Sequence, residues 1–142
     1  MTTETKTAPF AIAFDLEALN VVKDSDNVFI FPFLDNDGNE TGITVSVVGK
    51  HSDIVKSYVD RVLNKRRRED HMAEKSGKKA PRRVEEDEAL GLGMTAIRVV
   101  NWTGIKQPCT FENVSRLCEI NPLFVEQVTL HSDNISNFTQ SK

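Results

Sequence analysis

Cysteine is scarce in this chain, which limits the covalent and metal chemistry that the fold could use. Two of the 142 residues are cysteines, Cys109 and Cys118, and they form no Cys-x-x-Cys pair. A disulfide framework needs more cysteines, and a structural zinc ion needs four ligands. Two free thiols in a reducing compartment are therefore predicted, with a Cys109–Cys118 disulfide as the less favoured alternative.

Long apolar runs are also missing. The longest, residues 28–34, contains a proline and has the length of a strand, whereas a membrane helix needs about 18 apolar residues. Residues 1–8, MTTETKTA, lack the basic start and the apolar stretch of a secretory signal. These residues are predicted to form a loose tail. We expect a cytoplasmic protein with no membrane partner.

Catalytic motifs are absent as well. The sequence contains no phosphate-binding loop, no His-Glu-x-x-His and no nucleophile elbow. Its three histidines are His51, His71 and His131, and none has a nucleophile and a carboxylate at a local spacing. Cys118 with His131 could form a nucleophile and base, but a cysteine on a helix face is far more often part of the core. The prediction is that the chain is not an enzyme and needs no cofactor.

One acidic turn, at residues 35–40, has part of the pattern of a calcium loop. An EF-hand loop needs oxygen ligands at its first, third and fifth positions, glycine at the sixth and glutamate at the twelfth. With Gly38 at the sixth position, Asp35 and Asp37 fit, but Phe33 and Thr44 occupy the first and twelfth positions. The pattern therefore predicts a turn rather than a metal site.

Charge is distributed in three blocks, although the net charge is only −3. Residues 1–64 carry a net charge of −5, residues 65–83 a net charge of +6, and residues 84–142 a net charge of −4. This block pattern is the most visible organisational feature of the chain. Together with the patterns of apolar residues, it divides the chain into a predicted strand-rich α+β unit at 1–64, a basic connector at 65–83 and a helical subdomain at 84–142.

The first block predicts a β-hairpin after a short strand at residues 10–14. Residues 28–34, VFIFPFL, place their phenylalanines at alternate positions and therefore on one face. Turn-forming residues follow at 35–40, and residues 41–48 alternate apolar side chains with Thr and Ser. Because Pro32 cannot donate a ladder hydrogen bond, its strand should be an edge or should bulge there.

A helix should follow the hairpin and begin near Asp53, with Ser52 as the N-cap. Its apolar residues form one stripe at helical spacing, namely Ile54, Val55, Tyr58, Val59, Val62 and Leu63. Strands followed by an amphipathic helix indicate an α+β fold, in which we expect the helix to pack on the hairpin.

The basic connector has three interpretations. Ser76, Gly77 and Pro81 interrupt helical periodicity, which indicates an exposed linker. The block could also contact acidic protein surfaces or nucleic acid phosphates. It contains no aromatic residue for stacking on single strands, so nucleic acid is the least favoured partner. The residues proposed for partner contact are Arg66, Arg67, Arg68, Lys78 and Lys79.

The last block predicts small helices around Trp102. A helix is expected from residue 84 towards Trp102, although two glycines weaken it. Thr110 should cap a second helix, with Asn113 at its third position. Asn121 should cap a third helix with Pro122 at its first position. The apolar residues of these helices are predicted to face inward, namely Val114, Leu117, Cys118, Phe124, Val125 and Val128.

Residues 96–105, AIRVVNWTGI, resemble a segment of bacteriophage tail assembly chaperones that contains the same Trp-x-Gly spacing, here Trp102 and Gly104. In that family an Asn-Pro type of break, an amphipathic helix and a late Asn-Phe close the chain. Here Asn121 and Pro122 provide the break, and Phe138 ends the late pair. The likeness covers the chain from residue 96 to Phe138 and rests on order and spacing.

Between these points the family has a proline, a Ser/Thr, a Glu-Asn pair and a leucine-containing helix. The matching residues here are Pro108, Thr110, Glu112, Asn113 and Leu117. We predict that these residues and the tryptophan build a small core and its helix caps. They identify the family without forming a functional site themselves.

The resemblance implies a chaperone in the host cell cytoplasm. Such proteins bind the long tape measure protein and help recruit tail tube subunits, and a homo-oligomer is a further expected state. Two alternatives remain open. One is a minor tail or head–tail protein of the virion, and the other is a small nucleic-acid-binding protein that uses residues 65–83.

Overall fold

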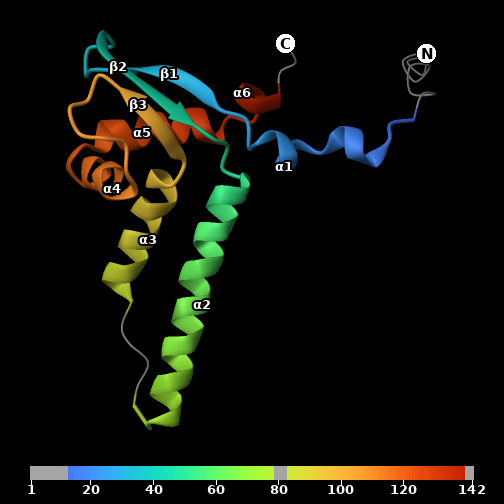
Figure 1. The fold of residues 1–142 in the computed structure, drawn as a ribbon, viewed down its shortest axis with the longest axis vertical. Helices are drawn as coiled ribbons and strands as arrows, with labels where there is room; N and C mark the ends of the chain where they lie inside the picture. Colours follow the sequence, from blue (N-terminus) through green and yellow to red (C-terminus); the bar gives the residue numbers. More distant parts are fainter. Residues whose placement is uncertain (1–12, 79–82, 140–142) are drawn as a thin grey trace, which may run out of the picture.

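The chain adopts an α+β fold in a computed structural model that describes residues 13–78 and 83–139. Three antiparallel strands form one sheet in the order β1-β2-β3, which confirms the predicted class. Figure 1 shows a head, which consists of the sheet with α4, α5 and α6, and a projecting pair of helices. The elements are η2 (Leu16–Leu19), α1 (Val21–Asp24), β1 (Phe29–Leu34), β2 (Glu40–Val47), α2 (Asp53–Lys75), α3 (Val84–Ala96), β3 (Val99–Thr103), α4 (Phe111–Ile120), α5 (Pro122–Asp133) and α6 (Ser136–Thr139).

The predicted hairpin is confirmed. Phe31 and Phe33 are buried, whereas Ile30 and Pro32, on either side of Phe31, are exposed, as the alternation predicted. The acidic turn is held by Asp35, whose Oδ1 accepts the backbone N–H groups of Asp37 and Asn39 at 2.9 Å each. This carboxylate is therefore engaged in shaping the turn. The predicted tail 1–8 and most of the predicted strand 10–14 lie outside the described residues.

Strand β1 is an edge strand, and its pairing with β2 shifts register between Pro32 and Leu34. Both outcomes were predicted from the proline. The amide of Gln127 on α5 covers this edge. Its Nε2 donates to the Leu34 carbonyl at 2.8 Å, and its Oε1 accepts the Leu34 N–H at 2.9 Å. A side chain thus pairs the backbone groups that a further strand would otherwise use.

Residues 99–103 form a strand, which corrects the prediction that the helix of the last block runs to Trp102. Helix α3 ends at Ala96, and Trp102 of β3 then pairs with Val45 of β2. Two consecutive β-branched residues, Val99 and Val100, favour extended backbone there. A third strand also supports the hairpin, since two strands alone are marginally stable in water.

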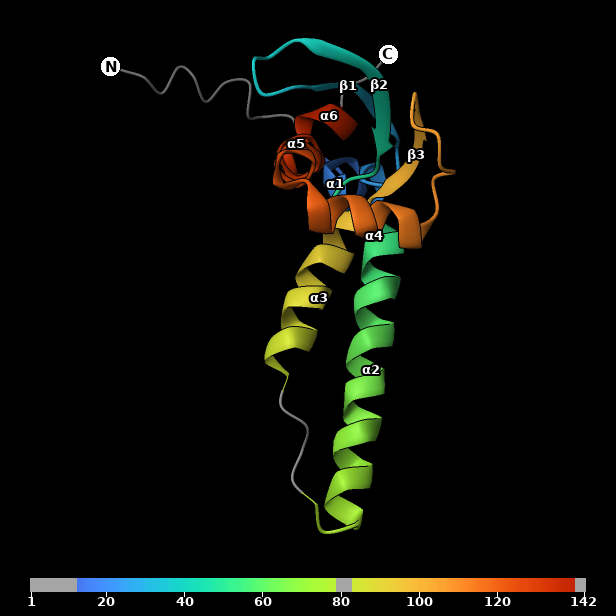
Figure 2. The same cartoon turned by 90° about the vertical axis from the view of Figure 1, so that its left-hand side faces the viewer.

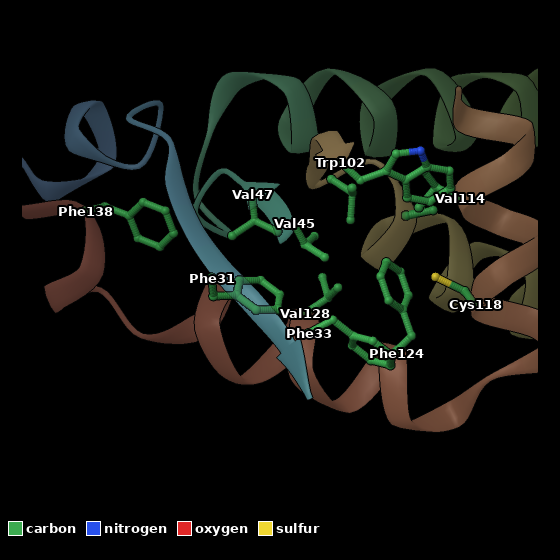
Figure 3. Packing of buried hydrophobic residues seen from close by; sticks show 12 residues of the cluster. Phe31, Phe33, Val45, Val47, Trp102, Val114, Cys118, Phe124, Val128 and Phe138 are labelled. Atoms are coloured by element: carbon green, nitrogen blue, oxygen red, sulfur yellow. The ribbon is translucent and has the colours of Figure 1, made fainter. Parts of the chain in front are cut away.

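One hydrophobic core unites residues from both sides of the basic block. The side chains meet between the sheet and helices α4 and α5 (Figure 3). The predicted division at residues 64 and 83 therefore does not separate two cores, because β3 carries residues of the last block into the sheet. The buried cluster consists of Phe31, Phe33, Val45, Val47, Ala96, Val99, Trp102, Val114, Cys118, Phe124, Val128 and Phe138.

Helix α2 does not cover the sheet, which corrects the expected packing of the first amphipathic helix. It projects beside α3, and α5 covers β1 and β2 instead (Figures 1 and 2). The stripe of α2 lies against the other helix, where Tyr58 and Val62 share a surface pocket with Ala89 and Leu90. Helix α5 buries Phe124, Val128 and Ser132 in this position, whereas α2 buries Val55.

The basic block begins as helix rather than as connector. Helix α2 extends to Lys75, so that residues 65–75 are helical, and Gly77 follows it with a φ of 71°. We call α2 and α3 together the helical hairpin. Tyr58 approaches α3 so closely that a Cβ on Gly93 would lie 1.9 Å from its Oη, which explains a glycine within that helix. No helix among the described residues is long and apolar enough to cross a membrane.

Candidate functional site

An apolar groove with a volume of about 310 Å³ lies beside Trp102. Its wall consists of strand residues, the loop after β3, and the facing sides of α4 and α5. Figure 3 shows Trp102 and Phe124 where the sheet meets these helices. We call this feature the apolar groove. Its lining residues are Phe33, Ile43, Trp102, Ile105, Gln107, Asn113, Arg116, Leu117, Ile120, Asn121 and Phe124.

Trp102 forms the floor of the groove and is 7% exposed. Its indole Nε1 donates to the carbonyl of Gln107 at 2.9 Å, which satisfies the one polar atom of the ring. The ring meets Phe124 edge to face, with centroids 6.4 Å apart. The predicted burial of Trp102 is confirmed, and its hydrogen bond also fixes the loop that forms the rim.

Gly104 allows the chain to turn tightly at the end of β3. Its φ is 87°, a region that favours glycine, and a Cβ there would lie 2.6 Å from the carbonyl oxygen of Gly42. The close approach places Ile105 near Ile43, and both side chains line the groove. A glycine is therefore required for steric and conformational reasons together.

The loop before α4 is held by the predicted caps. Thr110 Oγ1 accepts the backbone N–H of Asn113 at 3.1 Å, and Asn113 Nδ2 donates to the carbonyl of Pro108 at 2.9 Å. Both roles predicted for these two residues are confirmed. Asn121 caps α5 in the same way through the N–H groups of Leu123 and Phe124. Two helix starts thus fix the rim of the groove.

The residues of the tail-chaperone resemblance mostly gather around this groove. Trp102, Asn113 and Leu117 line it, and the other loop residues shape its rim. Two do not belong to it. Glu112 is exposed in the first turn of α4, and Phe138 is buried at another part of the core, with its ring 6.2 Å from that of Phe29.

Sequence reasoning did not predict the groove itself, whose apolar lining combines Phe33 and Ile43 of the first block with Ile105, Ile120 and Phe124 of the last block. Alternation in β2 places Ile43 on the core face, but its position beside Trp102 depends on β3 joining the sheet. The signal for β3 was the Val-Val pair before the tryptophan. Recognising it as a strand would have brought both segments together.

Buried titratable groups lie near the core but are poorly suited to nucleophilic chemistry. Burial raises the pKa of Cys118 to about 11 and also raises the pKa of Cys109, so both thiols are protonated at neutral pH. Both are free cysteines, as predicted. The imidazole of His131 stacks on Phe31 with centroids 4.2 Å apart, and burial lowers its pKa.

Acidic groups of the helical hairpin neutralise part of the basic block. Arg66 Nη2 lies 2.8 Å from Asp87 Oδ1. Arg83 Nη1 lies 2.7 Å from Glu86 Oε1, and its Nη2 also binds Asp70, which raises the pKa of the guanidinium. Arg66 is therefore engaged within the chain, which argues against the contact role predicted for it.

The outer side of α2 keeps its basic groups exposed. Arg67, Arg68 and Lys78 are on the surface, and so are Lys65 and Lys75. Lys79, the fifth residue predicted for partner contact, lies outside the described residues. These basic groups are not alone on this surface, because Arg67 and Lys78 line a pocket together with Asp70 and Glu74.

Comparisons with known proteins assign no family to the chain. No family model matches it, and no curated protein or solved structure matches it. Within residues 13–78 and 83–139, no group of three histidine, cysteine or acidic residues could hold a metal ion. The apolar groove and the surfaces beside it are therefore the candidate functional features of the molecule.

Proposed function

We propose that this protein is a tail assembly chaperone that binds the tape measure protein of a bacteriophage and helps recruit tail tube subunits. The observation that carries the proposal is the gathering of Trp102, Asn113 and Leu117 around one apolar groove. These residues belong to the segment that resembles the chaperone family. The three residues therefore belong both to the resemblance and to the lining of the groove.

The shape and chemistry of the groove support an apolar client. Its floor is made of aromatic and aliphatic side chains, and Arg116 is the one charged residue among those described in its lining. Amphipathic helices bind such grooves through apolar residues spaced three and four positions apart. A tape measure protein is long and helical, so it offers stripes of this kind that would aggregate if left uncovered.

The surface around the groove supports the same proposal. Ile120 lines the groove and is nevertheless 59% exposed. Apolar residues at the edge of a groove extend the contact that a helical client can make. A client holder needs such a surface rather than a closed pocket.

The proposal is tested by co-expression with the tape measure protein of the same phage. We expect the tape measure protein to remain soluble and to co-purify with the wild-type chain. Ile120→Arg should reduce the soluble fraction, because it places a charge in the groove, whereas Leu130→Arg provides an equally exposed control outside it. A tape measure protein that is equally insoluble with and without the wild-type chain contradicts the proposal.

A nucleic-acid-binding role is the second candidate, and the exposed basic side of α2 favours it. Changing the five residues predicted for contact to Gln removes five positive charges and no apolar surface. If the chain binds DNA, a mobility-shift assay should show affinity that falls steeply with salt and is lost in the variant. Binding to an acidic protein surface should instead weaken through slower association. The residues are Arg66, Arg67, Arg68, Lys78 and Lys79.

A further inference from the structure

The segment before β1 exposes more apolar surface than its short helices need. Phe14, Leu16, Leu19 and Val22 are 74%, 79%, 63% and 57% exposed. Val21 is also exposed, at 38%. Single apolar residues on a surface are ordinary, but five within nine positions indicate a contact. We call residues 14–22 the N-terminal arm.

The base of the N-terminal arm is fixed to the head. Asn20 Oδ1 accepts the N–H of Lys23 at 3.0 Å and caps α1. Ser25 is buried, and its carbonyl accepts the N–H of Gly49 at 2.8 Å. Asp26 Oδ1 accepts the N–H of Asp53 at 2.8 Å, where α2 begins. An anchored base lowers the entropy cost of docking the residues that precede it.

The N-terminal arm and the apolar groove lie on opposite sides of the molecule. In Figure 1 the chain before α1 leaves the head on the side away from α4, and the turned view in Figure 2 places α4 in front and α1 behind. Because the groove is lined from α4 and from the loop after β3, the arm of one molecule cannot fill its own groove. The arm of a second copy can fill the groove instead.

The two surfaces also match in charge. Asp15 and Glu17 are exposed within the arm among its apolar residues. Arg116 lines the groove, where it also pairs with Glu119 at 3.3 Å, and the exposed Lys106 lies between two lining residues. Apolar contact would supply affinity, while the opposite charges would set the orientation.

We infer that the N-terminal arm of one copy docks in the apolar groove of the next copy. Each molecule then contributes one arm and one groove, so the interface is heterologous and builds a chain or a ring. This association needs no client and does not depend on the proposed function. A client that binds the same groove displaces the arm, which couples client loading to disassembly.

Sedimentation velocity of the purified full chain over a range of concentrations tests the association. We expect the wild type to form oligomers whose size increases with concentration. The triple variant Phe14→Ser, Leu16→Ser and Leu19→Ser should weaken association by roughly tenfold or more, because it removes the anchors of the contact. Leu130→Ser removes an exposed apolar side chain outside both surfaces and should leave the oligomers unchanged.

The groove is tested by changing Ile120 in two ways. Ile120→Glu should weaken association more than Ile120→Lys, since the glutamate repels the acidic arm while the lysine attracts it. Both variants place a charge at a position that is already 59% exposed, so the fold should persist. Circular dichroism and the thermal midpoint check this for each variant.

Mixing two defective variants distinguishes this interface from other modes of association. The arm variant keeps an intact groove, and the Ile120→Glu variant keeps an intact arm. An equimolar mixture should therefore form a one-to-one dimer that grows no further. A wild type that is monomeric at its highest soluble concentration overturns the inference, as do variants that oligomerise like the wild type or a mixture that stays monomeric. Co-expression with the tape measure protein reads out the proposed function separately.

Discussion

The head and the helical hairpin are stabilised in different ways. In the head, aromatic and β-branched side chains from three strands and two helices fill a continuous core. In the helical hairpin, Val55 is the buried residue of α2, and further out Arg66 and Arg83 bind acidic groups. Ion pairs near the surface contribute little and are screened by salt. The hairpin should therefore open locally, at a lower free energy than the head.

Trp102→Ala should produce the largest loss of stability. It removes the buried ring that contacts Phe124 and breaks the hydrogen bond to Gln107. We expect the free energy of unfolding to fall by about 3–5 kcal/mol, which denaturant titration can measure. Met72→Ala on the exposed face of α2 should change it by about 0.5 kcal/mol or less. Equal effects at the two positions would contradict the contrast between the regions.

Gly104→Ala should have the next largest effect. The new Cβ would meet the carbonyl of Gly42 at 2.6 Å, and the backbone would keep a positive φ. We expect a loss of about 2–3 kcal/mol in a thermal or denaturant transition. Gly77→Ala is the matched control, because Gly77 has a φ of 71° but nothing within 4 Å of the added Cβ. A larger loss at Gly77 than at Gly104 would show that the turn beside the groove is not tightly packed.

Arg66→Gln should affect the helical hairpin and leave the head unchanged. The variant removes the ion pair with Asp87, at a cost of roughly 0.5–1 kcal/mol. Hydrogen exchange should quicken in the outer turns of α2 and at the start of α3, while β2 keeps its protection. High salt should produce a similar pattern in the wild type. Faster exchange in β2 as well would mean that the two regions unfold together.

His131 should give the smallest effect, confined to the head. Burial lowers the pKa of its imidazole below the ordinary value near 6.5. At a pH between the pKa of the folded chain and that of the unfolded chain, the unfolded chain binds more protons at this residue. The contribution of the neutral imidazole to stability is therefore fully present above about pH 6.5 and declines as the pH falls. The thermal midpoint should decrease less in His131→Phe than in the wild type between about pH 7.5 and about pH 5.5. Identical pH profiles would show that His131 does not contribute to the pH dependence of stability.

Local patterns predicted the elements whose signals lie within a few residues. The alternating phenylalanines predicted the buried face of β1, Pro32 predicted an edge with irregular pairing, and Thr110 and Asn121 predicted two helix starts. These features depend on backbone chemistry and on spacing along the chain. They therefore do not require knowledge of distant partners.

Packing between distant segments could not be predicted in the same way. The amphipathic stripe of α2 fits a sheet or another helix equally well, and only the presence of α5 on the sheet decides between them. The groove likewise depends on β3 pairing with β2, which brings Trp102 beside Ile43. The tryptophan segment was recognised in the sequence, but the surface that it helps to form was not.

The amide of Gln127, which covers the β1 edge at Leu34, also determines how the backbone can polymerise. Cross-β growth needs a monomer with two reactive edges, since each added chain must offer an edge to the next. Here β1 is closed at Leu34 and interrupted at Pro32, and β3 forms the other edge. In the terms of polymer chemistry the sheet is monofunctional, because it has one edge, that of β3, to which another strand can add. Pairing through β3 ends after one addition, which hinders the growth of fibrils.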